Sequence, residues 1–329
     1  FLIFLILIFS NKQFNYKMNE LSYSGDGSIN SENNIKDLLF RIFILYSVLS
    51  FIIFLLLNLS DIRMFNSLNL SMSLISAGGF IPTNSLDKII QSNPQKLVLI
   101  FSLLISLLNF FLILNIFEKK IIIRDHKEDL YLLILSLIFI LPVYFNNYSG
   151  LNIIISVLSS LGNSGLSLLN SESNLSLYFI LITIIGGSLI SNTSGIKFTR
   201  IYILLKTVYS EIIKLVSPNS VVNKNIFNSD KKITDDVIKI SFLIFISFFI
   251  SLFILSGILL FDSIDFEKSF KLSILTITNT TTSSMYDVGK VNFASLLTSS
   301  KLSLIIFMII GKIELISVFL IIKKIFFKD

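Results

Sequence analysis

The sequence contains no cysteine, only four prolines in 329 residues and a single histidine. Without cysteine, the chain forms no disulfide and has no thiolate ligand for a zinc or iron–sulfur site. The histidine, His126, lies in the charged stretch EKKIIIRDHKED, where we expect it to be solvated. The sequence also has no GxxxxGK[ST] loop, HExxH or GxSxG motif, so nothing in it predicts an enzyme.

Apolar residues dominate the chain instead. They make up 53% of it, phenylalanine alone supplies 32 residues, and the mean hydropathy is +0.82. Because about 20 apolar residues cross the hydrocarbon core as a helix, the long apolar blocks predict an all-α polytopic membrane protein. The predicted spans are 38–59, 97–117, 129–146, 175–206 with an interruption, 236–260 and 302–322.

The charge pattern predicts the orientation of the chain. Lys and Arg gather in 10–41, 118–128, 197–239 and 323–329, which the positive-inside rule places in the cytoplasm. This topology explains the net charge of +6, and we expect no nucleic acid partner. The first residues, FLIFLILIF, are too short for a span and lack the Met and basic segment of a signal peptide, so we interpret them as the tail of a truncated helix.

The same layout recurs three times between the basic loops. In each unit, a span leads into a shorter, moderately apolar segment, then a polar turn, then a span that returns. The shorter segments are 61–75, 151–160 and 265–277. At about 1.5 Å per residue, roughly 10 to 15 residues cannot cross a core about 30 Å thick, so we predict half-membrane helices. Each unit is therefore predicted to consist of a membrane helix, a pore helix, a filter loop and a second membrane helix, with the units arranged around a central pore.

The polar turns are candidate filter loops. A cation filter needs backbone carbonyls that replace the water around the ion, and glycine reaches the φ values that this requires. The first two turns carry a glycine in the same place, and their candidate ion-binding residues are Ser76, Ala77, Gly78, Gly79, Gly162, Asn163, Ser164 and Gly165. We expect the carbonyls of the first turn to face the pore axis. A plain loop or a repeat-built carrier also fits one such turn, but threefold recurrence favours a pore.

Five stretches resemble, in the same order, the TrkH branch of the Trk/Ktr/HKT superfamily of potassium uptake proteins. They are SLISAGGFIPTNSL, LLNFFLIL followed by DHKEDLYLL, IIGGSLISNTSGIKFTRIYILLK, LVSPNSVV and NFASLLTSSKLSLIIFMIIGKIELISVFLI, and they extend over 36–326. Members have four membrane–pore–membrane repeats, so the resemblance implies repeats two to four here. The implied domains are 1–35 (the end of repeat one and a cytoplasmic linker), 36–124 (repeat two), 125–234 (repeat three with a cytoplasmic linker) and 235–329 (repeat four).

The resemblance also implies a gate beneath the filter. GGSLISNTSGIKFTR matches the family's intramembrane loop in the second helix of repeat three, and the residues assigned to gating are Ser191, Asn192, Thr193, Ser194 and Gly195. These small residues interrupt a long apolar helix, although such a run can instead permit close helix packing. Lys312 lies in mid-span, where a charge costs at least about 2.5 kcal/mol. It stands in place of a family arginine that raises a barrier to cations.

The third polar turn departs from the family pattern. Family members carry a filter glycine there, whereas this chain has TNTTTSSMYDVG, with Thr281 or Ser283 in that place and no glycine before Gly289. Asn279, Thr280 and Thr281 are the candidate ion-binding residues of this turn, because carbonyls and hydroxyls still suit a cation. The selectivity for potassium over sodium therefore stays open.

The predicted function is uptake of potassium, or another monovalent cation, through this filter, either passive or coupled to an ion and without a cofactor. Two alternatives are a secondary carrier of a small solute and a non-conducting or regulatory homologue with a degenerate filter. The resemblance further implies a homodimer in the bacterial inner membrane with its filter loops facing outside. It also implies a cytosolic nucleotide-binding subunit of the TrkA type, docked on the basic loops 118–128 and 206–239.

Overall fold

The computed structural model describes most of the chain between residues 32 and 313. The described residues are 32–83, 85–117, 126–145, 149–169, 173–217, 223, 225–228, 232–262, 264–281, 284–287, 293 and 296–313. The predicted truncated helix at the start of the chain and the second half of the last span lie outside them. Within these ranges the chain is helical and forms no β-strand, apart from one isolated bridge between Asn225 and Lys232.

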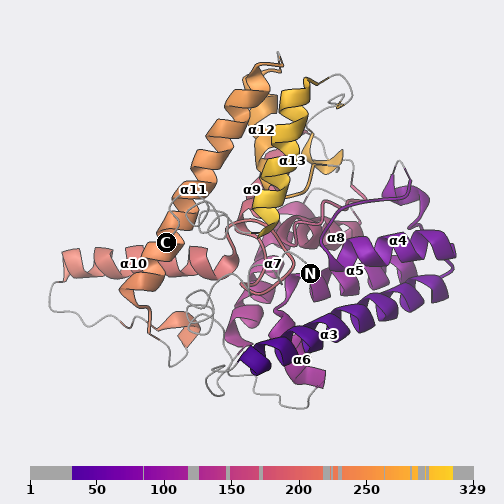
Figure 1. Ribbon diagram of the computed structural model, residues 1–329, viewed down its shortest axis with the longest axis horizontal. Helices are drawn as coiled ribbons and strands as arrows, with labels where there is room; N and C mark the ends of the chain where they lie inside the picture. Colours follow the sequence, from indigo (N-terminus) through magenta and orange to yellow (C-terminus); the bar gives the residue numbers. More distant parts are fainter. Residues whose placement is uncertain are drawn as a thin grey trace.

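The helices fall into three consecutive groups that correspond to the three predicted units (Figure 1). The first group contains α3 (Glu32–Leu59), α4 (Met64–Ile75), η1 (Leu86–Lys88), α5 (Asn93–Leu107) and α6 (Phe110–Phe117). The second contains α7 (Lys127–Tyr144), α8 (Gly150–Leu161), α9 (Ser173–Ile185) and α10 (Phe198–Val216), followed by η3 (Ile226–Asn228). The third contains α11 (Asp235–Leu260), α12 (Phe266–Ile277), η4 (Ser284–Tyr286) and α13 (Thr298–Ile313).

Each group has a short helix in its middle. The helices α4, α8 and α12 are each 12 residues long. Each therefore rises about 18 Å, well short of a bilayer core about 30 Å thick. Their bounds agree with the three short segments that the sequence predicts as pore helices.

The short helices join neighbouring groups. Each packs between the longer helices of its own group, and in addition α5 packs on α8 and α9 packs on α12. The returning helix of one group thus meets the short helix of the next, and this relation repeats along the chain. The arrangement brings the ends of the three short helices toward a common centre (Figure 1).

One side chain fixes how the first group turns back on itself. The carbonyl oxygen Oε1 of Gln95 accepts hydrogen bonds from the backbone N–H groups of Gln91 (2.8 Å) and Ser92 (3.1 Å), as in a capping box. Its amide nitrogen donates to the carbonyl of Ser60 (2.9 Å), at the end of α3. Gln95 therefore both starts α5 and ties that start to the preceding span.

The surface is apolar and the interior is rich in serine. Large apolar side chains point outward on the long helices, including Phe51 of α3 (58% exposed), Leu137 of α7 (62%) and Phe253 of α11 (60%). Buried serines lie along the inward faces, and hydroxyls such as those of Ser102 and Ser106 donate to carbonyls one turn earlier. Small residues inside and large apolar ones outside are typical of helices packed within lipid.

Two described helices are long and apolar enough to cross a membrane, by length and composition: Phe40–Leu59 with a mean hydropathy of 2.6, and Asp235–Leu260 with 2.8. Of the other predicted spans, 97–117 and 175–206 are each broken into two helices. The prediction that 97–117 forms one continuous helix is wrong. The helix α5 ends at Leu107 and α6 begins at Phe110, with Leu108 extended between them (ψ 163°). Contacts with the rest of the fold hold this break open, as described below.

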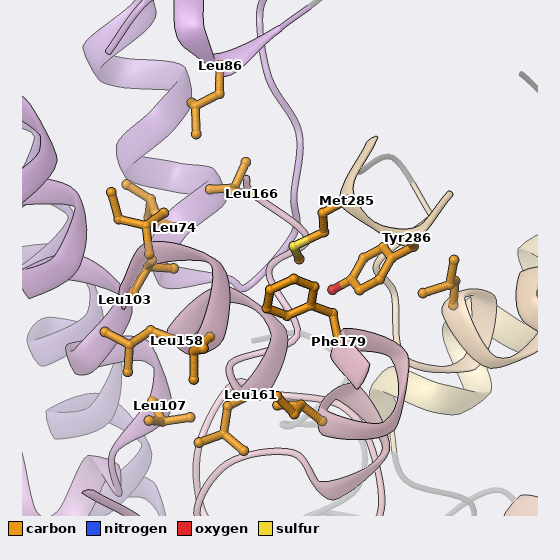
Figure 2. Close-up of a cluster of buried hydrophobic side chains, with 14 of the residues drawn as sticks. Leu74, Leu86, Leu103, Leu107, Leu158, Leu161, Leu166, Phe179, Met285 and Tyr286 are labelled. Atoms are coloured by element: carbon orange, nitrogen blue, oxygen red, sulfur yellow. The ribbon is translucent and has the colours of Figure 1, made fainter. Parts of the chain in front are cut away.

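The core lies where the short helices meet. Figure 2 shows Leu74 from α4, Leu103 and Leu107 from α5, and Leu158 and Leu161 from α8 in one cluster. Met285 and Tyr286, from η4, lie beside Phe179 of α9 and are fully buried. These side chains pack tightly around the polar turns and so hold their backbones in place.

Aromatic rings attach the linker before α11 to the rest of the protein. The ring of Phe227 stacks on Tyr202 (centroids 4.2 Å apart), Tyr131 (5.4 Å) and Phe198 (5.6 Å). Phe198 and Tyr202 belong to α10, and Tyr131 belongs to α7. The linker is thereby packed against α7 and against α10, the helix that follows the interruption after α9.

Candidate ion filter and gate

The three short helices end in the same backbone motif. In the first, the N–H of Gly78 donates to the carbonyl of Ser73 (2.9 Å) and that of Ala77 to Leu74 (3.2 Å). The equivalent pairs are Ser164 to Ser159 (3.0 Å) and Asn163 to Ser160 (3.2 Å) in the second, and Thr280 to Leu275 (2.8 Å) and Asn279 to Thr276 (3.1 Å) in the third. These are Schellman motifs, which reverse the chain at a helix end and satisfy two of the helix's last carbonyls.

The residue after each helix cap takes a left-handed conformation. It is Ala77 (φ 47°) in the first turn, Asn163 (φ 51°) in the second and Asn279 (φ 59°) in the third. Asparagine tolerates this region, whereas alanine pays about 1 kcal/mol or more to enter it. The shared motif fixes one register for all three turns, which we call filter turn 1 (76–79), filter turn 2 (162–165) and filter turn 3 (278–281).

This register settles which residue replaces the missing glycine. Gly79 (φ 70°) and Gly165 (φ 64°) are left-handed and close filter turns 1 and 2. Thr281 occupies that place in filter turn 3, and the alternative, Ser283, lies outside the described residues. The register also adds Thr278, which the sequence analysis missed and whose hydroxyl lies 3.0 Å from that of Thr280.

Two asparagines attach their turns to the returning helices. The amide nitrogen of Asn163 donates to the carbonyl of Thr183 in α9 (2.7 Å). The amide nitrogen of Asn279 donates to the carbonyl of Met308 in α13 (3.1 Å), which is the equivalent bond one unit later. Ala77 has no such group, so filter turn 1 depends on other contacts.

The interruption between α9 and α10, residues 186–197, is an irregular loop that we call the gate loop. Gly186 (φ 72°), Gly195 (φ 82°) and Lys197 (φ 79°) are left-handed, so the stretch is not a helix packed closely through small residues. A Cβ on Gly186 would lie 2.4 Å from the carbonyl oxygen of Ser194, so only glycine fits where the loop crosses itself. Backbone bonds between Ile196 and Ile184 (3.0 Å) and between Phe198 and Gly187 (3.0 Å) close its base.

The gate loop touches the filter turns. The amide nitrogen of Asn192 donates to the carbonyl of Ile75 at the end of α4 (2.6 Å), and the hydroxyl of Ser194 accepts from Asn279 (3.2 Å). Gly186 lies beside the side-chain oxygen of Asn163. The predicted gating residues and the predicted filter residues therefore form one connected region.

Lys312 bridges filter turn 1 and the gate loop. Its ammonium donates to the carbonyls of Ser76 (2.6 Å) and Ala77 (3.3 Å), and to the carbonyl of Asn192 (2.6 Å). Three backbone oxygens thus surround a positive charge at the end of a pore helix, where the helix dipole is negative. The ammonium stands where a monovalent cation would find similar ligands.

A second buried lysine, Lys197, holds the gate loop from inside. It is 2% exposed, and its ammonium donates to the carbonyls of Ser191 (3.1 Å) and Thr193 and to the hydroxyl of Thr193 (3.1 Å). By its sequence Lys197 belongs to the basic stretch 197–239, which was predicted to be cytoplasmic. The sequence feature that could have indicated its role is its place in the motif SGIKFTR, two residues after Gly195.

Two adjacent carboxylates were also missed. Glu128 and Asp129, at the start of α7, are 1% and 2% exposed. Oxygen Oε1 of Glu128 accepts from the backbone N–H of Leu189 (2.7 Å) and from the hydroxyl of Thr199, while Oδ1 of Asp129 accepts from the N–H of Asn109 (2.9 Å). Their charged surroundings in the sequence made them look like a solvated loop.

The prediction that His126 is solvated is wrong. Its side chain is buried, with one ring nitrogen 3.0 Å from the amide nitrogen of Asn115 and the other 3.7 Å from Asp129. A helix end packed against α6 removes it from water. Within the described residues no group of three or more His, Asp or Glu forms a metal site.

Comparison with solved structures gives the fold. The potassium transporter TrkH from Vibrio parahaemolyticus superposes with a TM-score of 0.76 over 90% of this chain and 66% of its own, at 19% sequence identity. At that identity the likeness shows the fold alone. The chain therefore has the TrkH fold and is an integral membrane protein of several helices, as the sequence motifs predict.

Sequence comparison agrees with this result. The chain is 25% identical over 301 residues to an uncharacterized cation transporter from Methanocaldococcus jannaschii, covering 87% of this chain. It spans 59% of the length of that relative. No family model matches the chain.

Proposed function

Because the chain has the fold of a TrkH transporter, we propose that it conducts monovalent cations across the membrane. The observation that carries the proposal is the threefold Schellman turn. Three short helices of equal length direct their carbonyl ends at one region, and their turns expose further carbonyls there. Partial negative charge converging from three helix ends favours a cation over an anion.

We propose that potassium is the transported ion, with the residues of the three filter turns as its ligands and without a cofactor. Gly79 and Gly165 support this role because their left-handed backbones turn successive carbonyls to the same side. Thr281 weakens discrimination against sodium, because a residue with a Cβ resists that conformation. The protein of Vibrio parahaemolyticus with the same fold is a potassium transporter.

We propose that the gate loop obstructs the path below the filter and that Lys312 strengthens this barrier. The support is contact: the loop bonds to the ends of α4 and α12 through Asn192 and Ser194. A fixed positive charge on the same path repels a second cation. Rearrangement of the loop would then open the way inward.

The proposal favours a pore over a carrier of small solutes. A carrier places its site at broken helices of paired repeats and needs no short helix before every polar turn. Here the short helix recurs in each described group with the same length and the same end. A non-conducting homologue remains the outcome that the transport measurement below would reveal.

Assembly is proposed on the resemblance alone. We propose a homodimer in the bacterial inner membrane, with filter turns outside, and a cytosolic nucleotide-binding partner of the TrkA type on the basic loops. Light scattering of the detergent-solubilised protein would give twice the chain mass for the dimer. A monomer mass across the concentration range would contradict it.

The proposed function is tested by uptake of rubidium or potassium in cells that lack their own potassium importers. The chain is expressed with any sequence that its gene encodes ahead of Phe1. We expect saturable rubidium uptake that potassium inhibits and sodium inhibits less. No uptake at any concentration, with the protein shown to be in the membrane, would overturn the proposal in favour of the non-conducting reading.

A further inference from the structure

The gate loop is attached to the protein by one carboxylate at both of its ends. Oxygen Oε1 of Glu128 accepts from the N–H of Leu189, in the first part of the loop, and from the hydroxyl of Thr199, two residues after the loop ends at Lys197. The two donors are ten residues apart in sequence but meet at a single oxygen. Glu128 itself belongs to α7, a different element with no other role in the filter.

The surface against which the loop rests is held by the neighbouring carboxylate. The N–H of Ser188 donates to the carbonyl of Leu107 (3.2 Å), and the N–H of Phe110 donates to the carbonyl of Ile190 (3.0 Å). These bonds use backbone groups that the break between α5 and α6 sets free. Asp129 binds the N–H of Asn109 inside that break. Successive residues of α7 thus hold the gate loop and the helix break on which it lies.

Two positively charged side chains attract the negative charge of Glu128. Lys197 and Arg200, one on each side of Thr199, attract its carboxylate. A carboxylate that is 1% exposed persists as a charge only when hydrogen bonds and opposite charges compensate it. Because the compensating groups all belong to the gate loop and the first turn of α10, the loop and the carboxylate stabilise one another.

We propose that Glu128 is a positioning residue that clasps the gate loop in its obstructing conformation. This role rests on the proposed function in one respect, namely that the loop obstructs a cation path. Glu128 touches neither the filter turns nor the ion, and acts through the backbone of Leu189 and the side chain of Thr199. Releasing the clasp removes the two bonds that Glu128 makes to the loop and to Thr199, and so favours opening of the loop.

The absence of cysteine permits a test that does not depend on transport. Leu189→Cys places a thiol on the loop beside the clasp, at a side chain only 7% exposed. The readout is its rate of reaction with a maleimide in purified, full-length protein. Adding Glu128→Ala should speed the reaction about tenfold or more, as expected when local opening loses a charged hydrogen bond.

Two further variants separate the clasp from general damage. Glu128→Gln keeps an acceptor oxygen for both donors but loses the charge that Lys197 and Arg200 attract, so its labelling rate should lie between those of the Leu189→Cys parent and the Glu128→Ala variant. Glu211→Gln removes an exposed carboxylate of α10, paired with Lys214 at 2.9 Å, and should change nothing. If Glu128→Ala fails to reach the membrane, Thr199→Val removes one donor and should still speed labelling several-fold.

If Glu128→Ala and Thr199→Val both label at the rate of the Leu189→Cys parent, the proposed role of Glu128 is wrong. It is also wrong if Glu128→Gln labels as fast as Glu128→Ala. Rubidium uptake is then measured on the same variants without the reporter. A higher maximal rate with an unchanged KM supports the clasp as part of the gate. Faster labelling with unchanged uptake keeps the clasp and instead counts against the proposed obstruction by the loop.

Discussion

At the scale of single residues, the three filter turns share a backbone but differ in side chains. The left-handed place after each cap is alanine once and asparagine twice, and the closing place is glycine twice and threonine once. Each asparagine is tied to a returning helix, whereas filter turn 1 is tied by Lys312 and Asn192. The turn with the weakest local anchoring is therefore the one that the gate loop and the lysine hold.

Gly165→Ala tests the need for glycine in a filter turn. A Cβ there would lie 3.2 Å from the Cα of Thr280, and the backbone has φ 64°, so we expect a loss of about 1–2 kcal/mol of stability and of most uptake. Thermal unfolding in detergent and rubidium uptake give the two readouts. The matched control is Gly257→Ala in α11, where a Cβ meets nothing within 4 Å and stability should be unchanged or higher. Equal behaviour of the two variants would contradict the prediction.

Lys312→Ala tests the charged bridge. Removing the ammonium breaks the bonds to Ser76, Ala77 and Asn192 and removes a positive charge from the path, so basal rubidium uptake should rise several-fold. Lys301→Ala, one of the first residues of the same helix, serves as the control and should leave uptake unchanged. Reduced or unaltered uptake in Lys312→Ala would count against a barrier role.

At the scale of elements, a helix or a helix break could be predicted from the sequence when the residues that cause it lie close together in the chain. The short helices were predicted because their length and the polar turns after them are visible in the sequence. The break at Leu108 and Asn109 was not, because no proline or glycine marks it. It exists because Asp129 and Ile190, distant in sequence, offer partners to the freed N–H groups. The burial of Glu128 and Lys197 was missed for the same reason.

Gly311→Ala tests the contact between α12 and α13. A Cβ on Gly311 would lie 1.9 Å from the carbonyl oxygen of Ile277, the last residue of α12, so the helices must separate. We expect a marked drop in the yield of folded protein in detergent, because the carbonyl belongs to backbone that cannot yield easily. Gly150→Ala, at an open position in the first turn of α8, should express normally. A normal yield and melting temperature for Gly311→Ala would show that the contact is looser than described.

At the scale of the whole molecule, one relation repeats: a returning helix packs on the next short helix, α5 on α8 and α9 on α12. The apolar outer faces and the serine-rich interior place this assembly in lipid, and the TrkH fold agrees with it. The fold was predictable from periodic apolar blocks and ordered motifs. The direct contact between gate loop and filter turns was not, since it joins residues more than 80 positions apart, such as Ser194 and Asn279.

The central claim is that the filter turns bind a cation with backbone oxygens. The most direct test is the anomalous scattering of rubidium in crystals of the protein grown in rubidium salt. We expect a peak enclosed by the filter turns, in contact with carbonyl oxygens of 76–79, 162–165 and 278–281. Well-ordered turns without such a peak, or rubidium bound only elsewhere in the protein, would contradict the account.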